Sequence, residues 1–136
     1  MENKGNIVKD KSYSFALRII KLSRFLNVEK KEYVLSKQIL KCGTSIGANV
    51  EEAIGGQTLK DFRSKMMIAY REARETKYWL NLLKDSDILD DNLAESLISD
   101  CEDIVRITGK IVSSTKQRMQ KDCSNAKQLV QSDFSD

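Results

Sequence analysis

Hydrophobic residues recur at alternating spacings of three and four along most of this chain. That period is typical of amphipathic helices with one buried side. The longest series, in residues 59–83, is Leu59, Phe62, Met66, Ala69, Ala73, Thr76, Leu80 and Leu83. A second series, in residues 39–53, is Ile39, Cys42, Ile46, Asn49 and Ala53. No proline interrupts the sequence, so the pattern predicts an all-α chain of long helices.

Turn and cap residues divide the pattern into four predicted helices. These run from Ser12 or Ser14 to Leu26, from Lys30 to Ile54, from a cap at Thr58 to Asp85, and from a cap at Asp90 or Asp91 to Gln120. Because the connections are short, consecutive helices are expected to be antiparallel, which gives an up-down-up-down four-helix bundle over residues 12–120. Residues 1–11 are predicted to be a flexible N-terminus, and residues 121–136, where periodicity is lost, a disordered tail.

Small and polar residues line the buried side of the second predicted helix. Gly43 and Gly47 would let a neighbouring helix approach closely, and an amide such as Asn49 in a helical seam commonly fixes register or oligomeric state. Asn49 could instead bond polar groups in a neighbouring helix of the same bundle. We assign a packing or oligomer role to Ser45, Ile46, Gly47 and Asn49.

The fourth predicted helix has a second apolar stripe, which consists of Ile98, Val105 and Val112. Its apolar side is therefore wider than one seam requires. Two interpretations remain open: deeper burial in the same bundle, or a contact between subunits.

The residue types that are missing argue against an enzyme. The chain has no histidine, so it cannot build Glu-x-x-His metal sites or Ser–His and Cys–His nucleophiles. Residues 43–47 lack the Lys-Ser/Thr of a phosphate-binding loop. Cys42, Cys101 and Cys123 form no CxxC pair and are predicted to be buried free thiols. We predict no catalytic residue, no metal and no cofactor. Because the N-terminus is polar and no apolar run is long, we also expect a cytoplasmic protein without membrane contact.

Positive charge is concentrated in the first part of the chain. Residues 11–50 hold eight Lys or Arg residues and two acidic ones, whereas residues 51–118 hold eleven basic and thirteen acidic ones. Such asymmetry indicates an anionic partner. On a helical projection the basic residues point away from the seams or flank them, and the candidates for nucleic-acid binding are Arg18, Lys21, Arg24, Lys30, Lys37 and Lys41. Few aromatic residues lie nearby, so contact with the nucleic-acid backbone is favoured over sequence readout.

The segment LSKQILKCGTSIGANVEEA, residues 35–53, resembles the four-helix-bundle proteins of the 23S rRNA intervening-sequence family. The family pattern Ser-Ile-x-Ala-Asn-x-x-Glu is filled here by Ser45, Ile46, Ala48, Asn49 and Glu52. The resemblance extends through residues 61–80 and covers most of residues 15–118. It implies a homopentamer with a central channel and no known catalytic activity. A related branch, the accessory variability protein of diversity-generating retroelements, binds nucleic acid and a reverse transcriptase.

Pattern and resemblance together predict a non-enzymatic homopentameric bundle that binds nucleic acid, RNA in preference to DNA, by contacts to the backbone. The alternative is a protein-binding adaptor, such as an accessory subunit of a reverse transcriptase. An adaptor would use the wide side of the fourth helix, or Tyr78 and Trp79.

Overall fold

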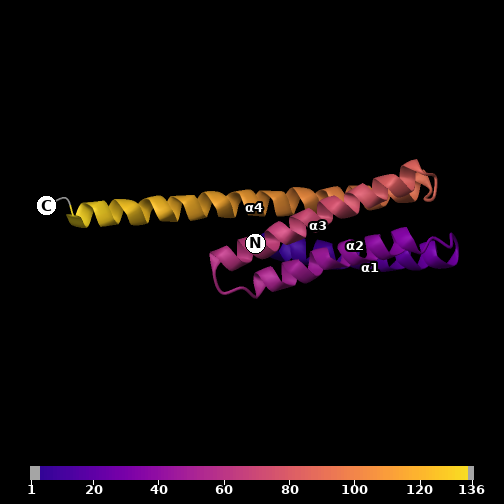
Figure 1. The fold of residues 1–136 in the computed structure, drawn as a ribbon, viewed down its shortest axis with the longest axis horizontal. Coiled ribbons are helices and arrows are strands. Elements are labelled where there is room, and N and C mark those ends of the chain that lie inside the picture. Colours follow the sequence, from indigo (N-terminus) through magenta and orange to yellow (C-terminus); the bar gives the residue numbers. More distant parts are fainter. Residues whose placement is uncertain (1–3, 135–136) are drawn as a thin grey trace.

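The computed structural model describes residues 4–134, which form four helices and no strand. The helices are α1 (Lys4–Val28), α2 (Val34–Ile54), α3 (Leu59–Asp85) and α4 (Asp91–Phe134). The α1–α2 and α3–α4 connections lie at one end of the bundle, and the α2–α3 connection lies at its other end, beyond which α4 continues (Figure 1). Helix α1 packs on α2 and α4, and α3 packs on the same two helices. The predicted all-α architecture is confirmed.

The predicted seams of α2 and α3 form the core. In α3 the fully buried residues are Met66, Ala69, Ala73, Thr76, Leu80 and Leu83. The cap at the start of α3 is also confirmed, because the Thr58 hydroxyl accepts a hydrogen bond of 3.0 Å from the Asp61 backbone N–H. In α2 the buried residues include Ile39, Cys42, Ile46, Val50 and Ala53. Val50, one residue after Asn49, completes this seam.

Helix α1 begins at Lys4, earlier than the predicted Ser12 or Ser14. The side chain of Val8 is fully buried, and it lies one turn before Ser12, which is also buried. Val8 therefore extends the buried stripe of α1 toward the N-terminus. Two adjacent apolar residues, Ile7 and Val8, among polar neighbours gave too weak a periodic signal to place this turn. Residues 4–11 are thus helical rather than a flexible segment, and residues 1–3 lie outside the described part of the chain.

Helix α2 begins at Val34 rather than at the predicted Lys30. Lys31 has a φ of 52°, in the left-handed region, and this turns the chain out of the helical path. The Glu32 carboxylate then accepts hydrogen bonds from the backbone N–H groups of Val34 and Leu35, at 3.1 and 2.9 Å. These bonds satisfy two of the free donors at the start of a helix. Lys30 therefore lies in the α1–α2 connection and not on α2.

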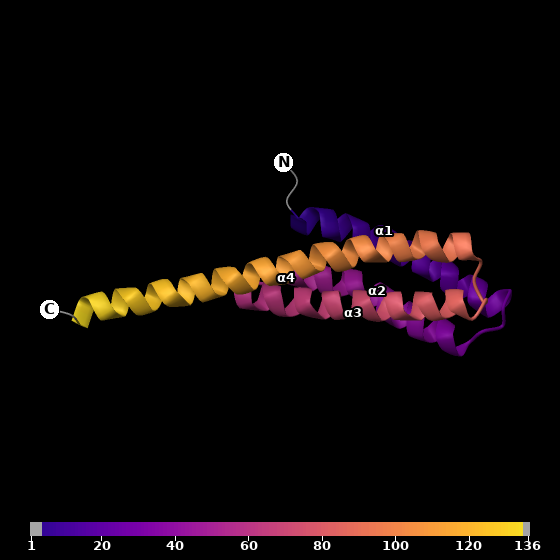
Figure 2. The same cartoon turned by 90° about the horizontal axis from the view of Figure 1, so that it is seen from above.

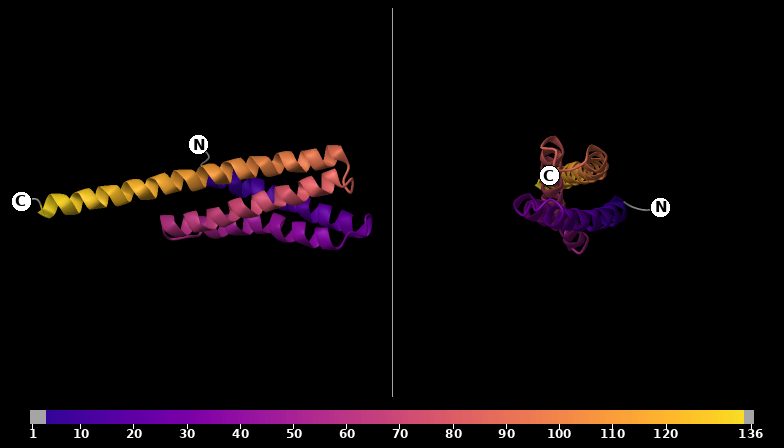
Figure 3. Two further views of the ribbon diagram at one scale, coloured as in Figure 1. Left: turned by 45° about the horizontal axis from the view of Figure 1, so that its top comes forward. Right: turned by 90° about the vertical axis from the view of Figure 1, so that its right-hand side faces the viewer.

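Helix α4 continues to Phe134 and projects well beyond the other three helices (Figures 1 and 2). The left-hand view of Figure 3 shows the same projection. The sequence analysis predicted a disordered tail from residue 121, so the structure differs for residues 121–134; residues 135–136 lie outside its described part. No glycine or proline follows Gly109, so no helix-breaking residue ends the helix within the described segment.

A membrane-spanning segment is not found among the helices of residues 4–134, because none combines sufficient length with sufficient apolar character.

Candidate nucleic-acid interface

Five of the six predicted nucleic-acid-binding cations surround the α1–α2 connection or follow it on α2. They are Lys21 and Arg24 near the end of α1, Lys30 in the connection, and Lys37 and Lys41 on α2. All five are exposed, and none of them forms an ion pair with a described residue. We call these five residues the basic end of the bundle. Their charges are available to an external anion.

Local contacts shape the basic end. The Lys30 ammonium lies 5.9 Å from the centre of the Phe25 ring, a cation–π contact that holds this side chain against the end of α1. Lys31, which the sequence analysis did not select, is exposed beside it. The adjacent lysines at positions 30 and 31 were the sequence signal that could have added Lys31 to the candidates. Glu32, the nearest acid on the α2 side, is occupied in capping α2. Tyr33 is 56% exposed in the same connection.

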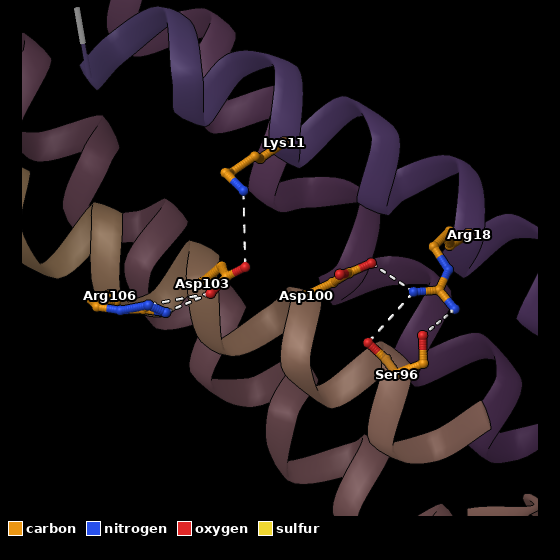
Figure 4. Close-up of polar contacts among 6 residues, drawn as sticks. All are labelled: Lys11, Arg18, Ser96, Asp100, Asp103 and Arg106. Carbon is orange, nitrogen blue, oxygen red and sulfur yellow. Dashed lines mark hydrogen bonds and ion pairs between the residues drawn. The ribbon is translucent and has the colours of Figure 1, made fainter. Parts of the chain in front are cut away.

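Arg18, the sixth predicted cation, lies elsewhere and is already paired. Its guanidinium Nη1 is 2.6 Å from Oδ2 of Asp100 on α4, and its Nη2 donates a hydrogen bond of 3.1 Å to the Ser96 hydroxyl (Figure 4). The structure therefore makes Arg18 a link between α1 and α4. Sequence reasoning missed this pairing because Arg18 and Asp100 are far apart in the chain.

The same α1–α4 surface carries more acidic groups. Lys11 on α1 is 3.9 Å from Asp103 on α4, and Asp103 also accepts from the Arg106 guanidinium (Figure 4). A shallow pocket beside these pairs is lined by Asp10, Lys11, Ser14, Phe15, Asp100 and Asp103. Three carboxylates in its lining would repel a phosphate backbone. The described α1–α4 surface is therefore less suited to a polyanion than the α1–α2 side.

Gly43 and Gly47 of α2, which the sequence analysis expected to permit close approach of a neighbouring helix, differ in the space around them. A Cβ added to Gly43 would lie 2.8 Å from Cγ2 of Ile19, so α1 and α2 approach too closely there for any side chain. A Cβ at Gly47 would lie 3.5 Å from the Ser12 hydroxyl oxygen, which is an ordinary contact. Close helix approach therefore depends on Gly43 more than on Gly47.

Asn49 is half-buried, and its amide donates a hydrogen bond of 2.8 Å to the Ser45 carbonyl one turn earlier. This polar group is thus satisfied within its own helix. The Ser45 hydroxyl is buried and has no acceptor at good hydrogen-bond geometry among the described residues. It is still close enough to the Glu72 carboxyl on α3 to lower the pKa of that group.

The second stripe of α4 is partly used inside the bundle. Val112 is buried, whereas Ile98 and Val105 are half-buried and pack against the edge of the core. The exposed parts of Ile98 and Val105 remain open to a second subunit. On α3, Tyr78 is 57% exposed and its ring meets that of Trp79 edge-to-face at 5.2 Å.

Two of the three cysteines are buried free thiols, as predicted, and Cys123 is exposed. Burial is the main cause that raises the pKa of Cys42 to about 11 and that of Cys101 to about 12. Both remain protonated at neutral pH, so neither is an activated nucleophile. Burial, and next the charge of Glu75, raise the pKa of Glu72. The described residues contain no group of three or more Cys, Asp or Glu side chains placed to hold a metal ion.

A family model and a solved structure are similar to this chain. The family model described as 23S rRNA-intervening sequence protein matches residues 4–110. A crystal structure of a protein of unknown function from Bacteroides thetaiotaomicron, assigned to the S23 ribosomal protein family, is similar to this chain with a TM-score of 0.79 and 47% sequence identity. The alignment covers 82% of this chain and 99% of that chain. No curated protein matches.

Proposed function

Because the chain belongs to the 23S rRNA-intervening sequence protein family, we propose that it is a non-enzymatic, homo-oligomeric protein that binds nucleic acid through the basic end of its bundle. One observation carries this proposal. None of the five cations of the basic end forms an ion pair with a described residue, whereas the other predicted cation, Arg18, is paired. Lys41 does lie close enough to Glu72 to oppose the rise in the pKa of that carboxyl. Unpaired surface cations of this kind neutralise phosphates and release counterions.

Binding in this proposal is directed at the backbone, and RNA is preferred. Four of the five cations are lysines, whose ammonium groups act as point charges on phosphates. Tyr33, exposed within the basic end, supplies a ring on which one unpaired base can stack. Unpaired, splayed bases are commoner in folded RNA than in duplex DNA, which supports the preference for RNA.

Assembly into a homopentameric ring of up-down-up-down bundles is part of the same proposal. One basic end offers only five charges, and a ring repeats them around its axis. The copies then act on one polyanion at a high effective concentration, so modest contacts give substantial affinity. The half-buried Ile98 and Val105 on α4 supply apolar surface for the contact between subunits.

The experiment compares two variants with the same change in net charge. Lys37→Glu/Lys41→Glu reverses two charges of the basic end, and Lys60→Glu/Lys110→Glu reverses two exposed lysines on α3 and α4. We expect the first variant to lose binding to a structured RNA by about 10-fold or more, and to reduce the slope of log affinity against log salt by about 2. Circular dichroism should show that both variants remain folded. Equal affinity in the two variants would place the interface elsewhere.

A second function, a protein-binding adaptor such as a reverse-transcriptase accessory subunit, is favoured by a different observation. Tyr78 is largely exposed, and the buried indole N–H of Trp79 beside it has no acceptor among the described residues. Tyrosine and tryptophan side chains commonly anchor protein interfaces. For an adaptor, Tyr78→Ala would abolish co-purification of a stoichiometric protein from the native host and leave RNA binding intact. If the protein instead binds nucleic acid without a protein partner, Tyr78→Ala would change neither co-purification nor RNA binding.

A further inference from the structure

The projecting part of α4, residues 116–134, lies beside Arg63 of α3 at its first turns and has no partner among the described residues beyond Cys123. Every residue from Gln120 to Gln131 is exposed, and these include Leu129 at 68% and Val130 at 55%. The family match ends at residue 110, before this segment begins. A single helix of about 19 residues with this composition is only marginally stable in water, so its persistence as a helix calls for a packing partner.

Four residues form an apolar line along the projection. Met119, Cys123, Ala126 and Val130 follow one another at spacings of four, three and four, the period of a coiled-coil seam. A shallow groove on this side is lined by Cys123, Ala126 and Val130 together with polar neighbours. We call these four residues the α4 seam.

The α4 seam continues a line that starts inside the bundle. Ile98, Val105 and Val112 are seven residues apart, and Met119 and Ala126 continue that spacing. Within the bundle these residues are half-buried or buried. Met119 is also half-buried, beside Arg63 of α3, whereas Ala126 is exposed. The same side of α4 thus supplies the apolar contact assigned above to a second subunit.

Charges beside the seam identify the occupant. In a heptad with Met119 and Ala126 at d and with Cys123 and Val130 at a, Asp122 takes position g and Lys127 takes position e. In a parallel, in-register pair, a g residue faces the e residue five positions later on the other helix. Asp122 of each copy then faces Lys127 of the other. Both residues are exposed, and neither forms an ion pair with a described residue.

We propose that residues 116–134 of neighbouring copies of this chain pack in parallel and in register through the α4 seam, as a short coiled coil beyond the bundle that repeats around the axis of the oligomer. Cyclic symmetry about an axis along α4 produces this parallel arrangement. The seam spans about two heptads, which is too short to hold copies together without a second contact. The inference therefore rests on the homo-oligomeric part of the proposed function. It does not depend on nucleic-acid binding.

Cys123 is a natural probe of this contact, because Cys42 and Cys101 are buried. Mild oxidation of the native full-length protein should join copies through Cys123, and Cys123→Ser should abolish the product. In the Cys123→Ser background, a cysteine introduced as Val130→Cys should also cross-link to itself. A cysteine introduced as Gln131→Cys, one residue away and outside the seam, should cross-link at least about threefold less. An antiparallel pair would not bring both position 123 and position 130 next to their own copies.

Charge reversal tests the register independently. Asp122→Lys should lower the Cys123 cross-linking yield about two- to fivefold, because it replaces two exposed ion pairs by two repulsions. The double variant Asp122→Lys/Lys127→Asp should restore the yield. Equal yields at positions 123, 130 and 131, or no restoration in the double variant, would overturn the proposal.

Light scattering and RNA binding separate this inference from the proposed function. An oligomer that binds RNA but does not cross-link at Cys123 contradicts the α4 seam alone. A monomer contradicts both the seam and the proposed ring. An oligomer that cross-links at Cys123 and does not bind RNA supports the seam and contradicts nucleic-acid binding.

Discussion

Gly43 and Gly47 lie one turn apart on α2, yet the space around their α carbons differs. A methyl group at Gly43 would overlap Ile19, whereas one at Gly47 would make an ordinary contact with Ser12. Gly43→Ala should therefore destabilise the fold by about 1–3 kcal/mol, the range for overpacked cores. Gly47→Ala should be neutral or stabilise the fold by up to about 1 kcal/mol through helix propensity. Urea unfolding measures both, and equal effects would contradict the close approach of α1 and α2.

Glu72, again a single residue, gives a prediction about how the stability of the fold depends on pH. Its pKa is raised in the folded chain, mainly by burial and then by Glu75. The folded state therefore binds the proton more tightly than the unfolded state, and ionisation of Glu72 opposes folding at neutral pH. That cost shrinks as the pH falls through the raised pKa of Glu72, and it is gone below the ordinary carboxyl pKa of 4.5.

Glu72→Gln removes this ionisation. We expect the variant to raise the Tm at pH 7 by about 2 °C and to have no effect in acid, below the ordinary carboxyl pKa. Glu29→Gln, at an exposed position after α1, is the control with the same charge change. A Tm gain that is the same at both pH values would show that ionisation of Glu72 is not its cause.

At the scale of helices, periodicity predicted those elements whose whole length is packed. The α3 seam from Met66 to Leu83 is buried as expected, because each of its turns contributes a core residue. Periodicity did not predict where α1 and α2 begin or where α4 ends. The first turns of α1 are fixed by one buried valine, Val8, and the projection of α4 carries few apolar residues. The start of α2 depends on the backbone of Lys31 and the Glu32 cap, which no hydrophobic pattern records.

The ion pair of Arg18 gives a prediction about the contact between helices α1 and α4. The Arg18–Asp100 pair joins α1 to α4, and its side chains are 34% and 47% exposed. We expect Arg18→Ala and Asp100→Ala each to reduce the free energy of unfolding by about 0.5–1 kcal/mol, and the double variant to cost less than their sum. Lys21→Ala, without an ion-pair partner in the described chain, should have little effect. Additive losses at Arg18 and Asp100 would mean that the pair does not act as a link.

At the scale of the whole molecule, the sequence predicted the basic region but not which of its charges are free. A count of charges along the chain located the excess between residues 11 and 50. It could not show that Lys11 and Arg18 face acids of α4, because those acids are distant in sequence and meet the cations only in the folded bundle. Among the cations of residues 11–50, those that form no ion pair with a described residue therefore lie on α1, on α2 or in the connection between them. These elements form the surface on which the account of function depends.

The most direct test of that account is the binding of the full-length protein to a labelled structured RNA over a range of roughly 50–300 mM salt. If the five cations of the basic end contact phosphates, the slope of log affinity against log salt should be about −4 or steeper. Lys37→Glu/Lys41→Glu should make that slope shallower, while Lys60→Glu/Lys110→Glu should not. Absence of binding at the lowest salt, or a flat salt dependence, would contradict a polyelectrolyte interface at the basic end.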